Sequence, residues 1–125
     1  MAEYRVPQIN RVMISGNLTD DPELKYLPSG KPVCNFRIAS NRRYKDATSG
    51  EWKDETSYFR VVLFGPQAER MGEILQKGHA VFIEGRLRER RWEDQSGQRR
   101  SIHEIVARRV QNLTKIPKPG QEEVD

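Results

Sequence analysis

Hydrophobic and polar positions alternate most regularly in residues 56–65, TSYFRVVLFG, and this two-residue period predicts a β-strand. One side of the strand is wholly apolar, fit for a core, and consists of Phe59, Val61 and Leu63. The other side places two aromatic rings around a cation and consists of Tyr58, Arg60, Val62 and Phe64. Rings beside a guanidinium favour a flat, anionic ligand such as single-stranded nucleic acid, whose bases stack and whose phosphates pair with arginine. A strand buried on both faces is an equally ordinary alternative.

Four further strands are expected from the same alternation, at residues 10–18, 33–40, 79–87 and 99–113. Gly16 interrupts the first of them and predicts a bulge or a close approach of two backbones. In the second, the expected inner face consists of Cys34, Phe36 and Ile38. Arg37 lies on its outer face.

One short helix is predicted between the third and fourth strands. Gly65 and Pro66 end the strand and begin the helix, because proline is favoured at the first helical position. Apolar residues then recur at helical spacing over about ten residues. Lys77 is expected at the end of the helix, and Gly78 directly after it as the C′ residue.

Two polar segments lengthen the strands. Residues 41–55 exceed the two to five loop residues of a tight hairpin, so either the strands continue or the segment is a functional loop. Trp52 lies in this segment, where its role stays open and a cap on the hairpin would explain it. Residues 86–100 predict a protruding hairpin with six arginines against three acidic residues. Exposed ribbons often carry charge to prevent edge association, but this many arginines favour contact with phosphates and bases.

The element order, three strands, a helix and two strands, predicts an all-β fold. Five short strands would leave open edges in a flat sheet, so closure into a small barrel is expected. A single domain over residues 1–115 fits a chain of 125 residues. A short, disordered acidic tail is expected over residues 116–125, beginning around Pro117, Pro119 and Gly120.

Composition adds a weak preference for polyanions. The formal net charge is +4, and the acidic tail leaves the body more basic still, which suits nucleic acid but equally an anionic membrane surface or an acidic protein. Cys34 is the single cysteine, so no intrachain disulfide is possible and a reducing compartment is expected. With no apolar leader and no run long enough for a bilayer, the expected location is the cytoplasm, without membrane contact.

Aromatic residues in polar surroundings are the main chemical signal. They are Tyr44, Tyr58, Phe64 and Trp92. Each has an arginine or lysine close by in the sequence, whereas core aromatics are normally flanked by aliphatic residues. We therefore predict that these four side chains stack on nucleic-acid bases.

Catalytic chemistry has little support. His79 and His103 lie in or at expected strands, and Cys34 lies on an apolar face, so all three are expected to be structural. No spacing of cysteine and histidine suits zinc, and no glycine-rich loop suits phosphate. The chain is expected to be no enzyme and to need no metal or cofactor, and a small nuclease on the same barrel is the enzymatic alternative.

Several motifs in one order resemble the bacterial single-stranded DNA-binding protein family. They are ISGNL with DPE at residues 14–23, RVVLFG at 60–65, KGHAVFIEGRLRERRW at 77–92 and DQSGQ at 94–98. The resemblance covers residues 10–113 and implies an oligonucleotide/oligosaccharide-binding (OB) barrel that forms homotetramers. It also implies base stacking by Tyr44, Tyr58, Phe64 and Trp92.

The same resemblance implies a set of phosphate contacts. These are Arg11, Lys25, Lys53, Arg60, Lys77, Arg90 and Arg91. Arg37, on the outer face of its strand, and Arg88, in the arginine-rich hairpin, are added from the residue pattern. The resemblance further places Phe59 near a subunit boundary, as an alternative to the core.

Two departures from the family pattern matter for function. Tyr44 and Tyr58 stand where the best-known members have tryptophan, which keeps the stacking mode but reduces its area. The long linker and its acidic tip are missing, which leaves open the recruitment of replication and repair proteins. The expected function is sequence-tolerant binding of single-stranded DNA in replication, recombination and repair. The alternative is a restart or recombination paralogue that acts mainly as an adaptor between proteins and DNA.

Overall fold

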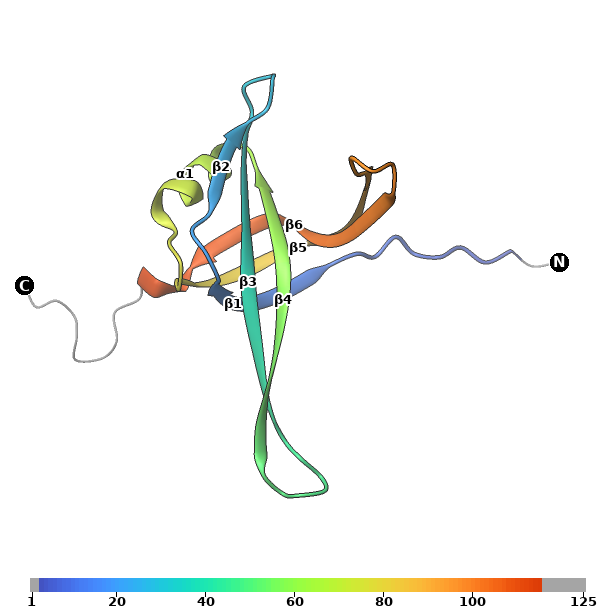
Figure 1. The fold of residues 1–125 in the computed structure, drawn as a ribbon, viewed down its shortest axis with the longest axis vertical. Coiled ribbons are helices and arrows are strands. Elements are labelled where there is room, and N and C mark those ends of the chain that lie inside the picture. Colours follow the sequence, from blue (N-terminus) through green and yellow to red (C-terminus); the bar gives the residue numbers. More distant parts are fainter. Residues whose placement is uncertain (1–2, 116–125) are drawn as a thin grey trace, which may run out of the picture.

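The structure is a computed structural model and describes residues 3–115. It contains six strands, one α-helix and one short 3-10 helix. Their bounds are β1 (Val12–Leu18), β2 (Glu23–Tyr26), β3 (Pro32–Lys45), β4 (Trp52–Phe64), α1 (Pro66–Ile74), β5 (Ala80–Glu93), β6 (Arg99–Asn112) and η1 (Leu113–Lys115). The predicted all-β class with one helix between the third and fourth expected strands is therefore confirmed (Figure 1).

Five of the strands close into a barrel. Their order is β1-β5-β6-β4-β3, and β1 returns to β3 through the pairs of Asn17 with Ala39 and Leu18 with Ile38. All pairings are antiparallel except that of β4 with β6, which is parallel. A five-stranded Greek-key barrel with this connection is the OB fold, as the sequence predicts.

The sixth strand, β2, lies outside the five-stranded closure and was not predicted. Its four residues pair with the beginning of β3 alone. Only Leu24 among them packs against the core, so no apolar alternation reveals the strand in the sequence.

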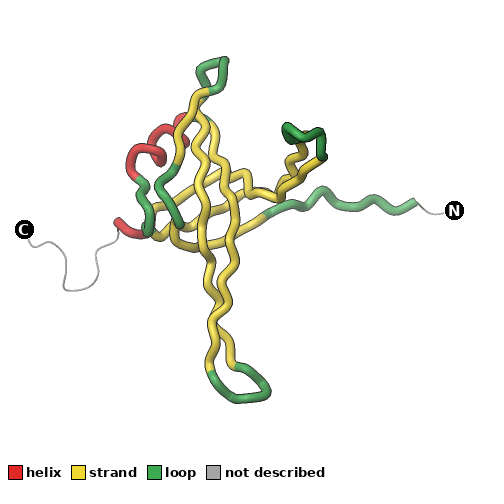
Figure 2. Tube along the Cα trace, in the orientation of Figure 1, coloured by secondary structure: helices red, strands yellow, loops and turns green. Residues whose placement is uncertain are grey.

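Two strand pairs continue well beyond the barrel. We call residues 41–45 of β3 with residues 52–56 of β4 the long ribbon. We call residues 88–93 of β5 with residues 99–104 of β6 the arginine hairpin. The first pair remains in register to Lys45 and Trp52, and the second to Glu93 and Arg99. Figure 2 shows strand geometry up to the short loop at each tip. The open question about residues 41–55 is thus answered in favour of continuing strands.

The core fills the barrel with the apolar side predicted for each strand. Cys34 and Val61 are 0% exposed, and burial raises the pKa of the Cys34 thiol to about 11. Phe59 is half-buried and packs against this core. At Gly16 a Cβ atom would lie 2.6 Å from the carbonyl oxygen of Ala39, so the predicted close approach is confirmed. The bulge lies elsewhere, between Glu84 and Gly85 on β5.

The helix ends earlier than predicted. It begins at Pro66, but Leu75 takes an extended backbone because its side chain, 3% exposed, enters the core. Lys77 is therefore beyond the helix, and Gly78 is no C′ residue. Gly78 instead occupies a separate turn with φ of 91°, in which the His79 N–H donates to Gln76.

Two predictions stay outside this description. The acidic tail, residues 116–125, lies beyond the described residues, so a domain boundary at residue 115 remains a prediction.

Over residues 3–115, the structure contains no helix of the length and apolarity that a bilayer crossing requires.

Candidate nucleic-acid interface

The outer face of β4 is exposed at one end and buried further along. Tyr58 is 55% exposed and Arg60 is exposed, whereas Val62 is only 5% exposed. Val62 lies beside the buried Val106 of β6. The strand is thus buried on both faces around Val62, while the predicted ring and cation of Tyr58 and Arg60 remain accessible.

A row of charged residues crosses four strands on this outer face. Arg37 of β3 is in register with Arg60 of β4, and Arg60 with Glu104 of β6. Glu104 is in register with Arg88 of β5. Neighbouring strands are about 4.8 Å apart, so three arginines flank a single carboxylate across the barrel. The row is net positive and fits an anionic strand laid across the sheet.

Tyr58 lies at the edge of this row with a cation on its ring. The guanidinium carbon of Arg37 is 4.7 Å from the ring centroid, which is cation–π geometry. A hollow of about 350 Å³ is lined by Arg37, Tyr58 and Arg60 together with Ile102 and His103. This is the place where the structure brings predicted stacking and phosphate-contact residues together most closely.

Trp92 forms a second ring-and-cation pair on the arginine hairpin. Its side chain is 41% exposed, and the guanidinium carbon of Arg90 is 4.8 Å from its ring centroid. A groove of about 590 Å³ at this hairpin is lined by Trp92, Arg91 and Arg100, among others. Arg91 pairs with the exposed Glu89 at 2.7 Å, and that pair lowers the pKa of the Glu89 carboxyl.

A buried carboxylate anchors the base of the arginine hairpin. Glu104 is 1% exposed, and its Oε2 accepts hydrogen bonds from the guanidinium of Arg88. Its Oε1 lies 3.5 Å from Nε of Arg90. Because Arg90 in turn covers Trp92, Glu104 supports that ring through one intervening side chain.

Tyr44, Phe64 and Trp52 also carry a cation, each in a different place. Arg42 lies 4.8 Å from the Tyr44 ring centroid and Lys31 lies 5.3 Å from that of Phe64. Arg43 lies 5.3 Å from the ring of Trp52, which is 59% exposed. The four predicted stacking residues therefore do not share one pocket. They are spread along an extended path over the barrel and its two projections, which we call the course.

The tips of both projections are built on an aspartate. Asp94 accepts hydrogen bonds from the Ser96 hydroxyl at 2.6 Å, from Arg100 at 2.9 Å and from the Gln98 N–H at 2.9 Å, and these donors lower its pKa to about 2. Asp46 pairs with Lys53 at 3.0 Å, and this pair, with the Thr48 N–H and the Ser49 hydroxyl, lowers its pKa.

The predicted phosphate contacts fall into three groups by their present partners. Those without an ion pair to any carboxylate of residues 3–115 are Arg11, Arg37, Arg60 and Lys77. Those in exposed or partly exposed pairs, which can exchange with phosphate, are Lys25, Lys53 and Arg91. Those held by the buried Glu104 are Arg88 and Arg90.

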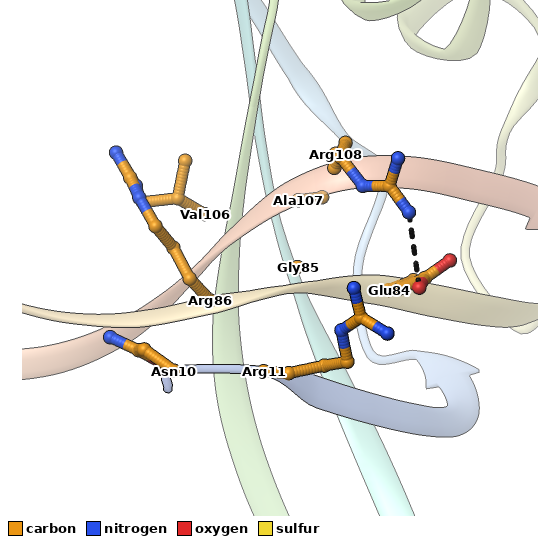
Figure 3. A pocket seen from close by; sticks show the side chains of 8 residues that line it. All are labelled: Asn10, Arg11, Glu84, Gly85, Arg86, Val106, Ala107 and Arg108. Carbon is orange, nitrogen blue, oxygen red and sulfur yellow. Dashed lines mark ion pairs between the residues drawn. The ribbon is translucent and has the colours of Figure 1, made fainter. Parts of the chain in front are cut away.

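Lys77 and Arg11 lie apart from the aromatic residues. Lys77 is in the turn after α1, where its N–H donates to Asp21. Arg11 lines a separate hollow of about 460 Å³ at the β5 bulge, with Arg86 and Arg108. Figure 3 shows these arginines around Gly85, with Arg108 paired to Glu84 at 3.1 Å. None of the four predicted stacking residues lines this hollow.

Sequence reasoning named Arg37 and Arg90 as phosphate contacts but missed Glu104 and the other cations that cover rings within residues 3–115, which are Lys31, Arg42 and Arg43. Arg42 and Arg43 lie next to Tyr44 in the sequence, so local cation–π pairing was a usable signal for Arg42. The pairing of Arg43 with Trp52 and the burial of Glu104 depend on strand register, which has no local signal. No group of histidine, cysteine, aspartate and glutamate side chains within residues 3–115 is arranged to hold a metal ion.

A closed five-stranded barrel that exposes rings and cations on one face and its projections defines an OB-fold protein of the oligonucleotide-binding class. Comparison with known protein families identifies one family over most of the chain. The model of the Single-strand binding protein family matches residues 9–113, and the chain belongs to that family, whose members bind rather than catalyse.

Solved structures agree with this assignment. A deletion variant of the single-stranded DNA-binding protein from Thermus aquaticus is 34% identical with a TM-score of 0.76. The match covers 86% of this chain and 52% of that one, so this chain spans about half the length of the Thermus chain. A Plasmodium falciparum SSB in complex with single-stranded DNA is 28% identical with a TM-score of 0.73, covering 82% and 90% of the two chains.

Proposed function

We propose that this chain binds single-stranded DNA without strong sequence preference and protects it during replication, recombination and repair. The observation that carries the proposal is the set of exposed rings, each paired with a cation, on the barrel and its projections. Membership of the family and the likeness to a protein solved with single-stranded DNA support it.

The mechanism combines stacking with charge. Each ring has two faces, so a guanidinium on one face leaves the other for a base, as at Tyr58 and Trp92. Arg37 and Arg60 lie beside Tyr58 without a carboxylate partner among the described side chains and are placed for phosphates. Every base has a π face, so this chemistry tolerates any sequence.

The site residues follow from this mechanism. Tyr58 and Trp92, the more exposed pair, are the central stacking residues, and Tyr44 and Phe64 extend the course at its ends. The cations proposed to contact phosphates are Arg11, Lys25, Arg37, Lys53, Arg60, Lys77, Arg88, Arg90 and Arg91.

Alanine substitution tests the stacking. Tyr58→Ala and Trp92→Ala should each weaken binding of oligo(dT) by about 1–3 kcal/mol, because each removes the platform of one base. Tyr26→Ala is the matched control, since Tyr26 is also 55% exposed but its hydroxyl donates to Glu69 and none of the described cations covers its ring. Fluorescence anisotropy gives the affinities. Unchanged affinity in both stacking variants would remove the proposed mechanism.

We further propose that the chain is no enzyme. The expected result is that labelled single strands stay intact when they are incubated with the protein and a divalent metal ion. Cleavage that depends on the protein and disappears when a carboxylate is mutated would overturn this proposal and favour a nuclease.

We also propose a homotetramer, working with replication and repair proteins at chromosomal DNA in the cytoplasm. Within the described chain, β1 pairs with β3 only through Asn17 and Leu18, which leaves most of that edge free for another copy. Tyr4, Val6 and Ile9 are each more than 80% exposed. The segment before β1 extends away from the barrel (Figure 1). Sedimentation analysis should give four times the chain mass, and a monomer would contradict the proposal.

A further inference from the structure

Trp52 is a large ring left in water at the far end of the long ribbon. It is the first residue of β4, is 59% exposed and takes no part in the core cluster. An exposed aromatic ring gains free energy when a flat partner covers it, so Trp52 offers a surface for such a partner. Trp52 is not among the four side chains proposed to stack on bases, so its exposed ring has no role assigned so far.

The register of the long ribbon determines which face Trp52 occupies. Trp52 is opposite Lys45, and two residues further along each strand Asp54 is opposite Arg43. Side chains at every second position share a face, so Trp52 lies on the same face of β4 as Tyr58 and Arg60. Tyr44, opposite Lys53, lies on the other face of the ribbon.

The face between Trp52 and Tyr58 is net positive, with Asp54 as its one acidic residue. On the β3 side it carries Lys45 and Arg43 near Trp52, and Arg37 beside Tyr58. The two-stranded ribbon twists, and the face turns with it toward the tip (Figures 1 and 2). A strand lying on Tyr58 therefore finds a charged path that leads to Trp52.

Trp52 has the same ring-and-cation construction as the proposed stacking residues. The guanidinium carbon of Arg43 is 5.3 Å from its ring centroid, compared with 4.7 Å for Arg37 over Tyr58 and 4.8 Å for Arg90 over Trp92. One face of the indole is covered by the guanidinium, and the accessible remainder of the ring is open to a flat partner.

We propose that Trp52 is a further base-stacking site, which carries the bound single strand from Tyr58 along the long ribbon. This inference rests on the proposed function and adds a site that none of the four predicted stacking residues provides. Tyr58 is six residue steps along β4 from Trp52, a span of about 20 Å at roughly 3.4 Å per step. Only a strand long enough to cover that span gains from Trp52.

The two tryptophans of the chain make the test direct. Trp92→Phe leaves Trp52 as the only indole and keeps a ring at position 92, and Trp52→Phe leaves Trp92. Titration of each variant with long oligo(dT) should quench the indole fluorescence in both. Quenching of Trp92 with no change at Trp52 would overturn the inference and leave the proposed function standing. No change at either indole would count against stacking altogether.

Affinity as a function of strand length gives the second readout. Trp52→Ala should weaken binding of long oligo(dT) by about 5- to 150-fold, the equivalent of one lost stacking platform, and leave binding of a strand that covers only Tyr58 unchanged. Tyr26→Ala, with an exposed ring elsewhere on the surface, is the control. If Trp52→Ala lowers the unfolding midpoint while long-strand affinity stays unchanged, the ring is a cap on the ribbon and the inference is wrong. A Trp52 signal that follows protein concentration and not DNA would likewise overturn it, in favour of contact between copies.

Discussion

The long ribbon and the arginine hairpin are two projections of one barrel, built alike at the tip and differently at the base. Each tip has an aspartate that accepts hydrogen bonds from its own turn, and a glycine with positive φ, Gly50 at 74° and Gly97 at 84°. At the base, the arginine hairpin holds the fully buried Glu104 under two guanidiniums. Among the described residues, the long ribbon has the exposed pair of Arg42 with Glu55 and the partly exposed pair of Lys53 with Asp46, and no buried pair.

Arginines in similar sequence surroundings therefore have different roles in the two projections. A buried carboxylate needs its partners, so Arg88 is tied to the fold of the hairpin. Exposed pairs contribute little to stability and are free to exchange a carboxylate for a phosphate. The arginine hairpin is thus tied to the barrel by a buried carboxylate near Trp92, whereas the long ribbon has no buried pair among the described residues.

The largest expected difference between the two projections is in stability. Arg88→Met should lower the free energy of unfolding by about 3 kcal/mol, at the low end for a broken buried pair, because Arg90 remains 3.5 Å from Glu104. Arg42→Met, in the long ribbon, should cost about 0–1 kcal/mol, because its pair with Glu55 is more than half exposed on both sides. Urea denaturation measures both.

A double variant sharpens this comparison. Replacing both partners, Arg88→Met with Glu104→Met, should recover most of the loss, because no buried charge is then left without its partner. Equal losses for the single variants in the two projections would show that the burial of Glu104 has no energetic consequence.

The next largest difference should appear in the salt dependence of DNA binding. Lys53→Met should reduce the slope of log affinity against log salt by about 0.7, the contribution of one phosphate on a single strand. Arg88→Met should reduce the slope by less than Lys53→Met, because Arg88 shares its charge between the buried Glu104 and any phosphate that it contacts. A slope that is equally reduced in the two variants would show that the pair with Glu104 does not restrain Arg88, and an unchanged slope in Arg88→Met would contradict its proposed phosphate contact.

The smallest expected effect is the loss of stability of the two tip turns at acidic pH. The pKa of Asp94 is lowered to about 2, first by the Ser96 hydroxyl and then by Arg100, from an ordinary value of 3.8. The stabilisation of the turn is therefore complete above the unfolded pKa and is lost as pH falls through about 2. Asp46 should behave in the same direction, with Lys53 as the main cause. NMR titration of the two carboxyl groups measures this, and ordinary pKa values at both would contradict the turn geometry.

The alternation of β4 predicted the exposed ring and cation correctly, because Val61 and Leu63 are strongly apolar and leave no choice of inner face. The burial of Glu104 could not be predicted from the sequence. An acidic residue in a strand is normally expected on the solvent-exposed face, and the arginines that pair with Glu104 lie on the neighbouring strand β5. The end of the helix was wrong for a related reason. Leu75 fits the helical period, but the core takes its side chain from an extended backbone.

The sequence indicates which aromatic residues have a cation beside them, but it does not indicate how these residues are arranged on the surface. Tyr44 and Trp52 are both exposed to some degree on the long ribbon, yet they occupy opposite faces. That assignment depends on the register of Lys45 with Trp52, and a slip of one residue would exchange the faces. Local sequence indicates aromatic residues beside cations, whereas strand pairing decides which of them a single DNA strand reaches together.

The most direct test of the central claim compares two ligands of equal charge on the unaltered protein. Oligo(dT) and an abasic deoxyribose-phosphate strand of the same length carry the same phosphates, but only the first has bases to stack on the rings. The account predicts that oligo(dT) binds more tightly by about 1–3 kcal/mol for each stacked base, with the same salt slope for both strands. Equal affinity for the two strands would contradict it, because charge alone would then account for binding.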